Sequence, residues 1–315
     1  MKPQVKKRLV VIGNGMAGAR AVEEILAKGG SIGLDITVFG DEPHGNYNRT
    51  RLGRVLSGED SEEDIFLNAL SWFRENNITL HAGVRVERVD KFSHHVFASD
   101  GRVVQYDQLI IATGSHPFLP PMEGLYTPSG TIRRGVFTFR TLDDARRMIV
   151  FARQEHIRRA VVFGGDSLAQ EAARGLRAQG LEVEVLSGIR GAAILGTDPI
   201  TGVSVSTQAD RDCHMVVLTA GSRPNVDLAV VSGLAVERGI VVDDHLRVMD
   251  EEDVYAVGEC AQHRGEVYGM VAPLWEQAAV LADHITGSDR GSMYLGTRTI
   301  PHSNAGSLLA PSGGK

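Results

Sequence analysis

The sequence predicts an α/β protein with two doubly wound, three-layer domains, the second of them shortened and inserted into the first. Two observations carry this prediction. An apolar strand pattern, a glycine-rich turn and a helix pattern follow one another at residues 9–28, and again at residues 160–179. A strand, turn and helix in this order open a Rossmann-like dinucleotide-binding domain, in which the turn approaches a pyrophosphate.

The first glycine-rich turn covers residues 13–18 and follows four apolar residues. Gly13 permits the tight turn, Gly15 lets the backbone approach a pyrophosphate, and Gly18 lets the helix pack closely on the strand. A helix is predicted over residues 17–28, because a pair of glycines follows it. Its N-terminus presents unpaired N–H groups and the positive end of the helix dipole to phosphate.

An acidic residue after the next strand completes the dinucleotide-binding pattern. The apolar strand 35–39 is followed by Gly40, Asp41 and Glu42. Glu42 lies close to the roughly 20-residue spacing at which an acidic side chain binds a ribose hydroxyl. We prefer Glu42 to Asp41, which can serve as a turn residue alone. The alternative is a surface turn after an ordinary βαβ unit.

Length, charge and hydropathy exclude several classes of protein. The chain has 315 residues, of which 43% are hydrophobic and 23% charged, enough for two domains with sizeable cores. Its formal net charge of −6 argues against general affinity for nucleic acid. No apolar run approaches the roughly 20 residues of a membrane span. Three basic residues precede only four apolar ones near the N-terminus, so we expect no signal peptide and a cytoplasmic location.

Cysteine usage predicts neither a metal cluster nor a redox-active disulfide. Cys213 and Cys260 lie too far apart for a Cys-x-x-Cys motif or a ferredoxin-type ligand set. The first domain also holds no Cys-x₄-Cys pair. We therefore expect no bound metal.

Between the two turns, the pattern predicts further elements of the first domain. A helix is expected at residues 64–76, with Trp72 and Phe73 on its apolar side. Strands are expected at residues 79–80, 84–86, 96–98 and 106–111, with a hairpin turn at residues 100–101. The last strand ends in a glycine-containing segment, residues 112–115, which suits close approach of a ligand. A capping-box pattern at residues 141–144 opens another helix.

The segment after Glu42 contains three arginines, Arg49, Arg51 and Arg54. Arginines beside a phosphate-binding turn can pair bidentately with phosphate oxygens. Solvated surface charge is the alternative, and the arginines taken alone favour it.

The second glycine-rich turn departs from the dinucleotide-binding pattern. Gly164 and Gly165 are followed by Asp166, which replaces the middle glycine, and Ala169 takes the last position. A side chain at residue 166 obstructs close backbone approach, and its carboxylate faces the place of an anionic pyrophosphate. Either effect costs on the order of a few kcal/mol.

The second domain is predicted to be short. A helix at residues 167–179 and a strand at 182–186 complete one βαβ unit, and residues 191–210 show little periodicity. No acidic residue ends the second strand, and Arg190 suits either a 2′-phosphate or a solvated turn. We expect a first domain of residues 1–140 plus 229–290, a second of residues 141–228, and a tail of residues 291–315.

Together these motifs resemble those of the pyridine nucleotide-disulfide oxidoreductase-like family. Within it, the chain is similar to the N-terminal flavin module of assimilatory nitrite reductase large subunits and related nitrate reductase electron-transfer subunits. The resemblance covers roughly residues 8–286 and is carried by residues 10–18, 42–44, 46–49, 112–115, 220–225, 254–260 and 268–277.

The resemblance implies that the first domain binds FAD. Glu42 would hold the adenosine ribose, Arg49 would approach the pyrophosphate, and Arg54 lies where related flavoproteins place a lysine near the flavin ring. Glu259 would hold the ribityl chain. The helix that begins at residues 273–275 would face the pyrimidine edge of the flavin, with a core position as the alternative for Trp275. The implied cofactor-binding residues are Gly13, Gly15, Met16, Ala17, Gly18, Glu42, Arg49, Arg54, Val86, Ala112, Thr113, Gly114, Gly258, Glu259, Pro273, Leu274 and Trp275, with Gly164, Gly165, Asp166 and Ala169 on a possible nicotinamide side.

Two functions follow from the resemblance. The first is an FAD-dependent oxidoreductase that passes electrons from NAD(P)H through FAD to a partner reductase or iron–sulfur protein, in nitrate or nitrite assimilation. The alternative is an FAD-bearing subunit of a larger redox complex, with a degenerate nicotinamide site and an electron-transfer or structural role. Neither needs a catalytic side chain, because the cofactor carries the chemistry. The chain also ends without the family's C-terminal interface domain, so we expect docking against a partner subunit.

Overall fold

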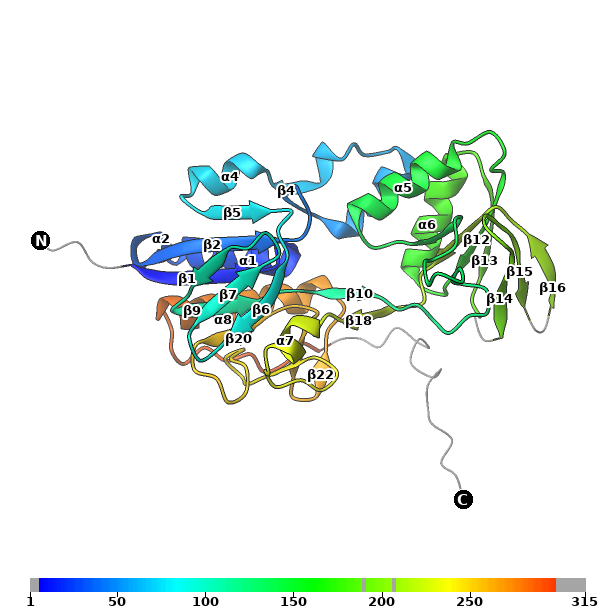
Figure 1. Ribbon diagram of the computed structural model, residues 1–315. Helices are drawn as coiled ribbons and strands as arrows, with labels where there is room; N and C mark the ends of the chain where they lie inside the picture. The colour runs from blue at the N-terminus through cyan, green and yellow to red at the C-terminus, as the bar shows by residue number, and fades with distance from the viewer. Residues whose placement is uncertain (1–5, 189–190, 206–207, 299–315) are drawn as a thin grey trace, which may run out of the picture. The chain divides into compact units, whose positions relative to one another are not determined.

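The computed structural model describes residues 6–188, 191–205 and 208–298, and the described chain divides into two compact units. The first unit comprises the chain up to Asn48, Phe66–His116 and Arg223–Thr297, and the second comprises Arg49–Ile65 and Pro117–Ser222. These bounds differ from the expected domains, because residues 49–65 and 117–140 group with the second unit and residues 223–228 group with the first. Figure 1 shows the elements of each unit.

A five-stranded parallel sheet forms the centre of the first unit, in the order β20-β9-β1-β2-β5. Its strands are β1 (Lys7–Ile12), β2 (Leu34–Gly40), β5 (Thr79–Ala82), β9 (Gln108–Ile111) and β20 (Val254–Ala256). Because β1 pairs with β2 on one side and β9 on the other, the turn after β1 lies at the carboxyl edge of the sheet where the strand order reverses. Ligands of open α/β sheets bind at such a point.

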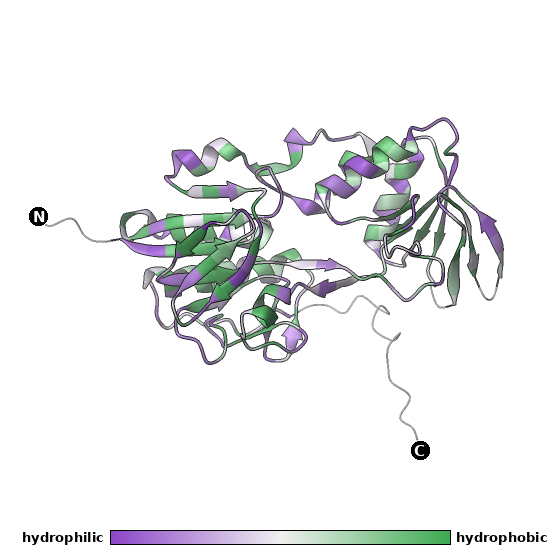
Figure 2. Ribbon diagram, viewed as in Figure 1, coloured by the Kyte–Doolittle hydropathy of each residue, from purple (hydrophilic) through white to green (hydrophobic). Residues whose placement is uncertain are grey.

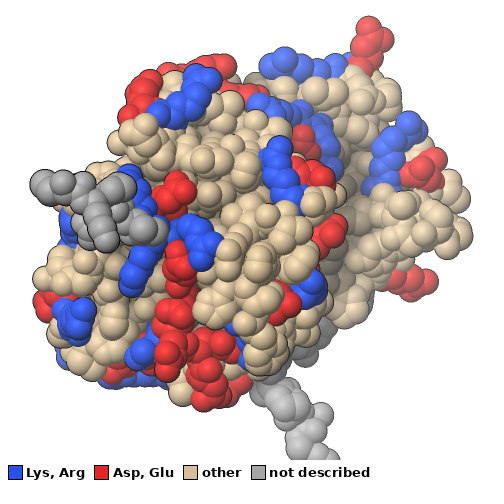
Figure 3. All heavy atoms as spheres, turned by 60° about the vertical axis from the view of Figure 1, so that its left-hand side comes forward, with Lys and Arg blue, Asp and Glu red and all other residues tan. Residues whose placement is uncertain are grey.

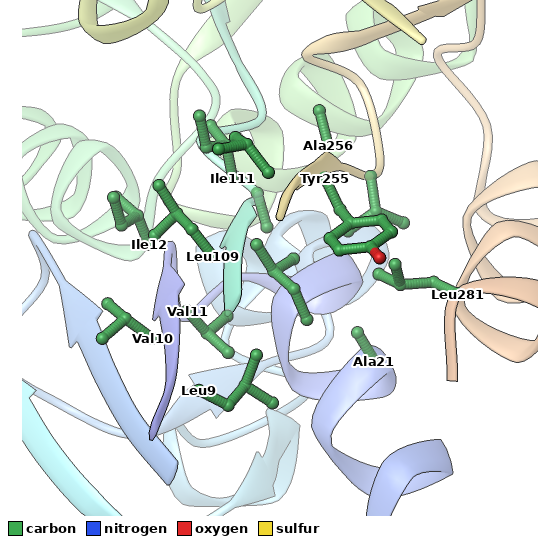
Figure 4. Packing of buried hydrophobic residues seen from close by; sticks show 14 of the residues in the cluster. Leu9, Val10, Val11, Ile12, Ala21, Leu109, Ile111, Tyr255, Ala256 and Leu281 are labelled. Carbon is green, nitrogen blue, oxygen red and sulfur yellow. The ribbon is translucent and has the colours of Figure 1, made fainter. Parts of the chain in front are cut away.

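The strand β1 is apolar on both faces, as a central parallel strand must be. Leu9, Val10, Val11 and Ile12 are all buried. Figure 4 shows these residues in one cluster with residues of β9 and with the helices α1 (Met16–Ala27) and α8 (Val271–Thr286), which pack against each other. The helix predicted at residues 17–28 is therefore confirmed within one residue at each end.

The first unit contains several shorter elements around this sheet. They are α2 (Gly30–Gly33), β3 (Asn46–Tyr47), β4 (Phe66–Asn68), α4 (Leu70–Glu75), β6 (Val86–Asp90), β7 (His95–Ala98), β8 (Val103–Gln105), α7 (Asp227–Val231), β19 (Ile240–Val242), β21 (Ala261–His263) and β22 (Glu266–Val267). The strands β6, β7 and β8 form an antiparallel sheet, and the predicted hairpin turn at residues 100–101 joins β7 to β8. The strand expected at 84–86 begins only at Val86.

The single helix predicted at residues 64–76 is wrong. The chain forms a 3₁₀ turn, η2 (Glu63–Ile65), then the strand β4, and only then the helix α4. The reason is long-range pairing: β4 pairs antiparallel with β3, and the N–H of Asn68 donates to Oδ1 of Asn46 at 3.1 Å. Phe73 is buried, as expected of the apolar side of the helix.

The second unit is built on a four-stranded parallel sheet in the order β11-β17-β12-β13. Its elements are η1 (Arg49–Arg51), α3 (Leu52–Ser57), β11 (Val136–Thr138), α5 (Leu142–Ala152), β12 (Arg159–Phe163), α6 (Ser167–Ala178), β13 (Glu182–Leu186) and β17 (Met215–Leu218). The predicted second strand–turn–helix–strand unit is β12, α6 and β13. The predicted capping box also forms, between Thr141 and Asp144.

Residues 49–65 belong to the second unit because α3 packs on α6. A Cβ added at Gly175 of α6 would lie 2.6 Å from Cγ of Leu56, so only glycine lets α3 approach this closely. The amide of Gln179 also donates to the carbonyl of Leu56 at 2.8 Å. Leu56 is fully buried as a result.

The segment of low periodicity, residues 191–210, contributes to an antiparallel sheet. The strands are β14 (Ala192–Gly196), β15 (Ile200–Val205) and β16 (Gln208–Asp212). Register irregularities near Leu195 and Val203 interrupt the two-residue alternation, which explains why the sequence pattern was weak. Within the described residues, no helix lies between β13 and β14, and β13 is the edge of its sheet. The second unit as a whole is longer than the expected residues 141–228, because it also takes in residues 49–65 and 117–140.

Apolar residues concentrate along the strands and helix faces inside each unit (Figure 2). No helix among the described residues is long and apolar enough to cross a bilayer.

Two further strands, β10 (Ser115–Pro117) and β18 (Ser222–Pro224), pair where the chain passes from one unit to the other. Basic and acidic side chains are interspersed on the face that Figure 3 shows, so this face carries no broad basic surface for nucleic acid.

Candidate functional site

The first glycine-rich turn is packed against the end of β9. Gly13 has φ +116°, and its N–H donates to the carbonyl of Phe39 at 2.8 Å. A Cβ at this position would lie 2.1 Å from the carbonyl oxygen of Ala112. A Cβ at Gly18 would lie 2.0 Å from the carbonyl oxygen of Gly13. Both glycines are therefore required by the tightness of the turn itself.

Gly15 differs from these two glycines, because open space surrounds it. It is the N-cap of α1, with φ −82°, and no described atom beyond Gly15 and its two chain neighbours lies within 4 Å of the place of a Cβ. No side chain caps α1, and its first turn holds no acidic residue. The N–H groups of the first turn, which begins with Met16 and Ala17, are thus available to an anionic acceptor. A pyrophosphate fits this cradle.

Glu42 follows β2, as the sequence predicted, and its side chain is half-exposed. The Tyr47 hydroxyl donates to the Glu42 carboxylate, 3.0 Å from Oε2. Asp41 is more exposed, and its carboxylate lies 3.8 Å from Nε of Arg85. Glu42 is therefore the better oriented of the two acidic side chains.

The chain after β20 returns to the first turn. Gly258 has φ +91°, and a Cβ there would lie 2.6 Å from Cβ of Ala17. Its N–H donates to Oε1 of the buried Gln277 at 2.8 Å. The next residue, Glu259, is buried, and the Ser115 hydroxyl donates to its Oε2 at 2.7 Å. A buried carboxylate thus follows a backbone segment pressed against α1.

The exit from β9 is fixed by hydrogen bonds to a second segment. The Thr113 hydroxyl donates to the carbonyl of Asn225 at 2.7 Å, and the N–H of Asn225 donates to the carbonyl of Gly114 at 2.9 Å. Gly114 has φ +67°, which favours glycine. Ala112 is buried under Gly13 and Gly18.

The helix α8 begins beside Gly258. Pro273 and Leu274 are buried in its first turn, and Cδ2 of Leu274 lies 3.6 Å from the place of a Cβ on Gly258. Trp275 has 51% of its surface exposed and lies under the guanidinium of Arg20, 5.5 Å from the ring centroid. The alternative of a core position for Trp275 is therefore wrong.

The three remaining implied cofactor residues are Val86, Arg49 and Arg54. Val86 is buried in the hydrophobic core of the first unit at the start of β6. Arg49, in η1, and Arg54, in α3, belong to the second unit. The Arg54 side chain is 46% exposed and pairs bidentately with the buried Asp60 at 2.8 and 2.9 Å. This hydrogen bonding lowers the pKa of Asp60. Nε of Arg51 donates to the same carboxylate at 2.9 Å.

The second glycine-rich turn has its own capping residue. A Cβ on Gly164 would lie 2.0 Å from Oγ1 of Thr219, so this glycine is required, whereas Gly165 has only Ser187 within 4 Å. Asp166 is the N-cap of α6, and its Oδ1 accepts a hydrogen bond from the N–H of Ala169 at 3.1 Å. The carboxylate thus takes one of the donors that a pyrophosphate would use. Arg190 lies outside the described residues.

Two residues that support the first site had no individual signal in the sequence. Ser115 is hydrogen-bonded to Glu259. Gln277, in the second turn of α8, accepts a hydrogen bond from the backbone of Gly258. Both contacts join segments far apart in the chain. Only the resemblance, which includes both positions, could have indicated them.

Comparison with known proteins agrees with this arrangement. A family model described as pyridine nucleotide-disulphide oxidoreductase matches residues 7–193 and 168–279. The chain belongs to this family. The resemblance inferred from the motifs is thereby confirmed, as are the two-domain fold and an oxidoreductase family.

Two similar relatives come from Bacillus subtilis (strain 168). The chain is 39% identical over 313 residues to an assimilatory nitrate reductase electron transfer subunit, covering 90% of this chain and 39% of the relative. It is 40% identical over 316 residues to a nitrite reductase [NAD(P)H], covering 90% of this chain and 38% of the relative. The chain thus spans about two fifths of the length of these relatives.

A solved ferredoxin reductase from Rhodopseudomonas palustris shares the fold. It is 23% identical, with a TM-score of 0.79, and the match covers 90% of this chain and 76% of that one. At this identity the likeness concerns the fold alone.

Proposed function

We propose that this chain is an FAD-dependent oxidoreductase module that passes electrons from NAD(P)H to a partner reductase or iron–sulfur protein in nitrate or nitrite assimilation. The single observation that carries the proposal is the uncapped N-terminus of α1 beside Gly15, within a member of the pyridine nucleotide-disulphide oxidoreductase family. When bound, FAD supplies the capacity to take up a hydride and release single electrons. The protein supplies binding, orientation and charge.

Different residues of the first unit would bind different parts of FAD. The N–H groups at the start of α1 would bind the pyrophosphate, and Glu42 would accept hydrogen bonds from the adenosine ribose. Glu259 would accept from the ribityl hydroxyls. The N-terminus of α8, beside Leu274, would stabilise negative charge on the flavin ring. Arg49 and Arg54 stay predictions as ligands, and both residues belong to the second unit.

The names of the relatives support the partner class. One is an electron transfer subunit of a nitrate reductase, and the other is a nitrite reductase that uses NAD(P)H. Because the chain spans about two fifths of each, the electron acceptor of this chain would lie in polypeptide that corresponds to the remainder, or in a separate partner. We also propose a cytoplasmic location, which the two buried free cysteines support.

A second candidate function is favoured by Asp166. In this alternative the chain bears FAD as a subunit of a larger redox complex, and its nicotinamide site has degenerated. The observation is that the Asp166 carboxylate caps α6 where the pattern requires a bare glycine. A pyrophosphate at this turn would have to displace that side chain and would meet its negative charge.

One experiment tests the proposal and separates the two candidates. The purified protein, loaded with FAD, is mixed anaerobically with NADH or NADPH while the flavin absorbance is followed. Fast bleaching supports the oxidoreductase. No bleaching with either nucleotide, together with normal reduction by dithionite, supports the subunit with a degenerate site. A protein that binds no FAD contradicts both.

A further inference from the structure

The hydroxyl of Tyr47 contacts both oxygens of the Glu42 carboxylate, at 3.0 Å from Oε2 and 3.2 Å from Oε1. Tyr47 is the second residue of β3 and is 8% exposed, whereas the Glu42 side chain is 41% exposed. The buried Tyr47 therefore orients the half-exposed carboxylate of Glu42. Each carboxylate oxygen keeps a lone pair for another donor.

The ring of Tyr47 is itself held in place. The imidazole of His44 packs edge-on against it, with ring centroids 5.4 Å apart, and also contacts Phe66 of β4 at 5.6 Å. Nε2 of His44 lies 3.4 Å from Oε2 of Glu42. Glu42 thus lies against two side chains that pack on each other, so that its carboxylate loses little further freedom when it binds a ligand.

The two-stranded ribbon of β3 and β4 also reaches the first glycine-rich turn. Asn46, beside Tyr47, is 1% exposed, and its Nδ2 lies 3.5 Å from Oδ1 of Asn14 in that turn. Asn68 of β4 donates from Nδ2 to Oε1 of Glu23 in α1 at 2.6 Å. One ribbon therefore contacts the turn, the helix behind it and the predicted ribose-binding carboxylate.

We propose that Tyr47 is a positioning residue that aims the Glu42 carboxylate at the adenosine ribose, and that it thereby sets the preference of the site for a dinucleotide with intact ribose hydroxyls. This inference rests on the proposed function, since it concerns the same FAD site. It assigns a role to the β3–β4 ribbon, which the implied cofactor residues do not include. Tyr47 acts through Glu42 and does not itself contact the ligand.

The test compares two ligands in apo-protein, by the quenching of flavin fluorescence. One ligand is FAD, and the other is an FAD analogue whose adenosine ribose lacks both hydroxyls. Wild-type protein should prefer FAD by about tenfold or more, since hydrogen bonds to a charged group are lost with the analogue. Tyr47→Phe should weaken FAD binding by about three- to tenfold and change the affinity for the analogue by less than about twofold. A purely structural role would weaken both ligands equally.

Tyr106→Phe is the matched control. Tyr106 is also buried in the first unit, and its hydroxyl has no hydrogen-bond partner among the described residues. This variant should keep the wild-type preference for FAD. Loss of the preference in Tyr106→Phe would overturn the assignment to Tyr47.

A second variant tests the same contact from the exposed side. Glu42→Asp withdraws the carboxylate from Tyr47 by one methylene and should lose the preference for FAD even if Tyr47→Phe fails to fold. The double variant should be no weaker in FAD binding than Glu42→Asp alone, because Tyr47 acts only through that carboxylate. Additive losses, or an unchanged preference in Tyr47→Phe, overturn the inference while FAD binding by the wild type upholds the proposed function. An unchanged preference in Glu42→Asp overturns the ribose contact of Glu42 and the inference with it. Failure of the wild type to bind FAD overturns both.

Discussion

Oδ1 of Asp166 accepts a hydrogen bond from the N–H of Ala169 at 3.1 Å, so the residue that replaces the middle glycine of the second turn caps the helix behind it. The first turn has Gly15 at the equivalent place, without any side-chain cap on α1. The two turns begin with the same strand–turn–helix arrangement and differ in what occupies the helix N-terminus. We therefore expect the first turn to bind an anion more tightly than the second.

Replacing Asp166 should restore nucleotide binding at the second turn. Asp166→Gly removes both the Cβ and the carboxylate, and should raise the affinity for NADH or NADPH by about tenfold or more, as expected when a repelled charge is removed. Isothermal titration of the FAD-loaded protein measures the change. Asp166→Asn serves as a control, because it keeps a capping oxygen and removes only the charge. Unchanged affinity in both variants would contradict this explanation of the second turn.

The first turn allows folding and binding to be separated by two glycine substitutions. Gly15→Ala places a Cβ in open space at φ −82°, so the thermal stability of the apo-protein should change little. FAD affinity should nevertheless fall by about tenfold or more, because the Cβ obstructs the approach of the pyrophosphate. Thermal unfolding and FAD titration together measure this.

Gly13→Ala is the counterpart. It combines φ +116° with a contact of 2.1 Å to a backbone oxygen, and should destabilise the apo-protein by about 1–3 kcal/mol or more. Equal losses of stability in the alanine variants of Gly13 and Gly15 would argue against an open cradle at Gly15.

The elements that the sequence predicted correctly are those fixed by neighbours along the chain. The strand β1, its glycine turn and α1 follow from a local apolar run and local turn chemistry, and so do β12, α6 and β13. The capping box of Thr141 and Asp144 spans four residues and could equally be predicted from the sequence. Gly13 was predicted for the tight turn and Gly18 for close packing, and a Cβ at either position would meet backbone oxygen at 2.1 and 2.0 Å.

The elements that were missed depend on contacts between distant segments. The strand β4 exists because β3 pairs with it, and no pattern within residues 64–76 records that pairing. The strands β14 and β15 carry register irregularities that hide their alternation. The pairing of Arg54 with Asp60 was not predicted, while the role of Arg54 beside a ligand stays a prediction.

Acid stability should depend on Asp244. Hydrogen bonds from Arg264, foremost, and from the buried His263 lower the pKa of Asp244 to about 2. The ionised form is thus favoured in the folded state. Its contribution of roughly 1–2 kcal/mol is present above the unfolded pKa near 3.9 and is lost as the pH falls toward 2. Asp244→Asn should lower the free energy of unfolding at neutral pH and flatten its decline between about pH 4 and 2.

Urea unfolding at a series of pH values measures this dependence. Asp212→Asn is the control, because its side chain is 85% exposed and approaches Arg159 only to 3.6 Å. In the control, the free energy of unfolding should fall between about pH 4 and 2 as it does in the wild type. An equally steep fall in Asp244→Asn would show that other carboxylates determine the acid stability.

Thr141 should stabilise the second unit through its capping box. Its hydroxyl accepts the N–H of Asp144 at 3.0 Å, while the Asp144 carboxylate accepts the N–H of Thr141 at 3.1 Å. Thr141→Ala leaves the N–H of Asp144, at the start of α5, without its acceptor. It should therefore lower the free energy of unfolding by about 1 kcal/mol. Thr141→Ser keeps the hydroxyl and should recover most of this loss. Denaturant unfolding compares the three proteins, and equal stability of the alanine variant and the wild type would mean that packing of α5 outweighs its cap.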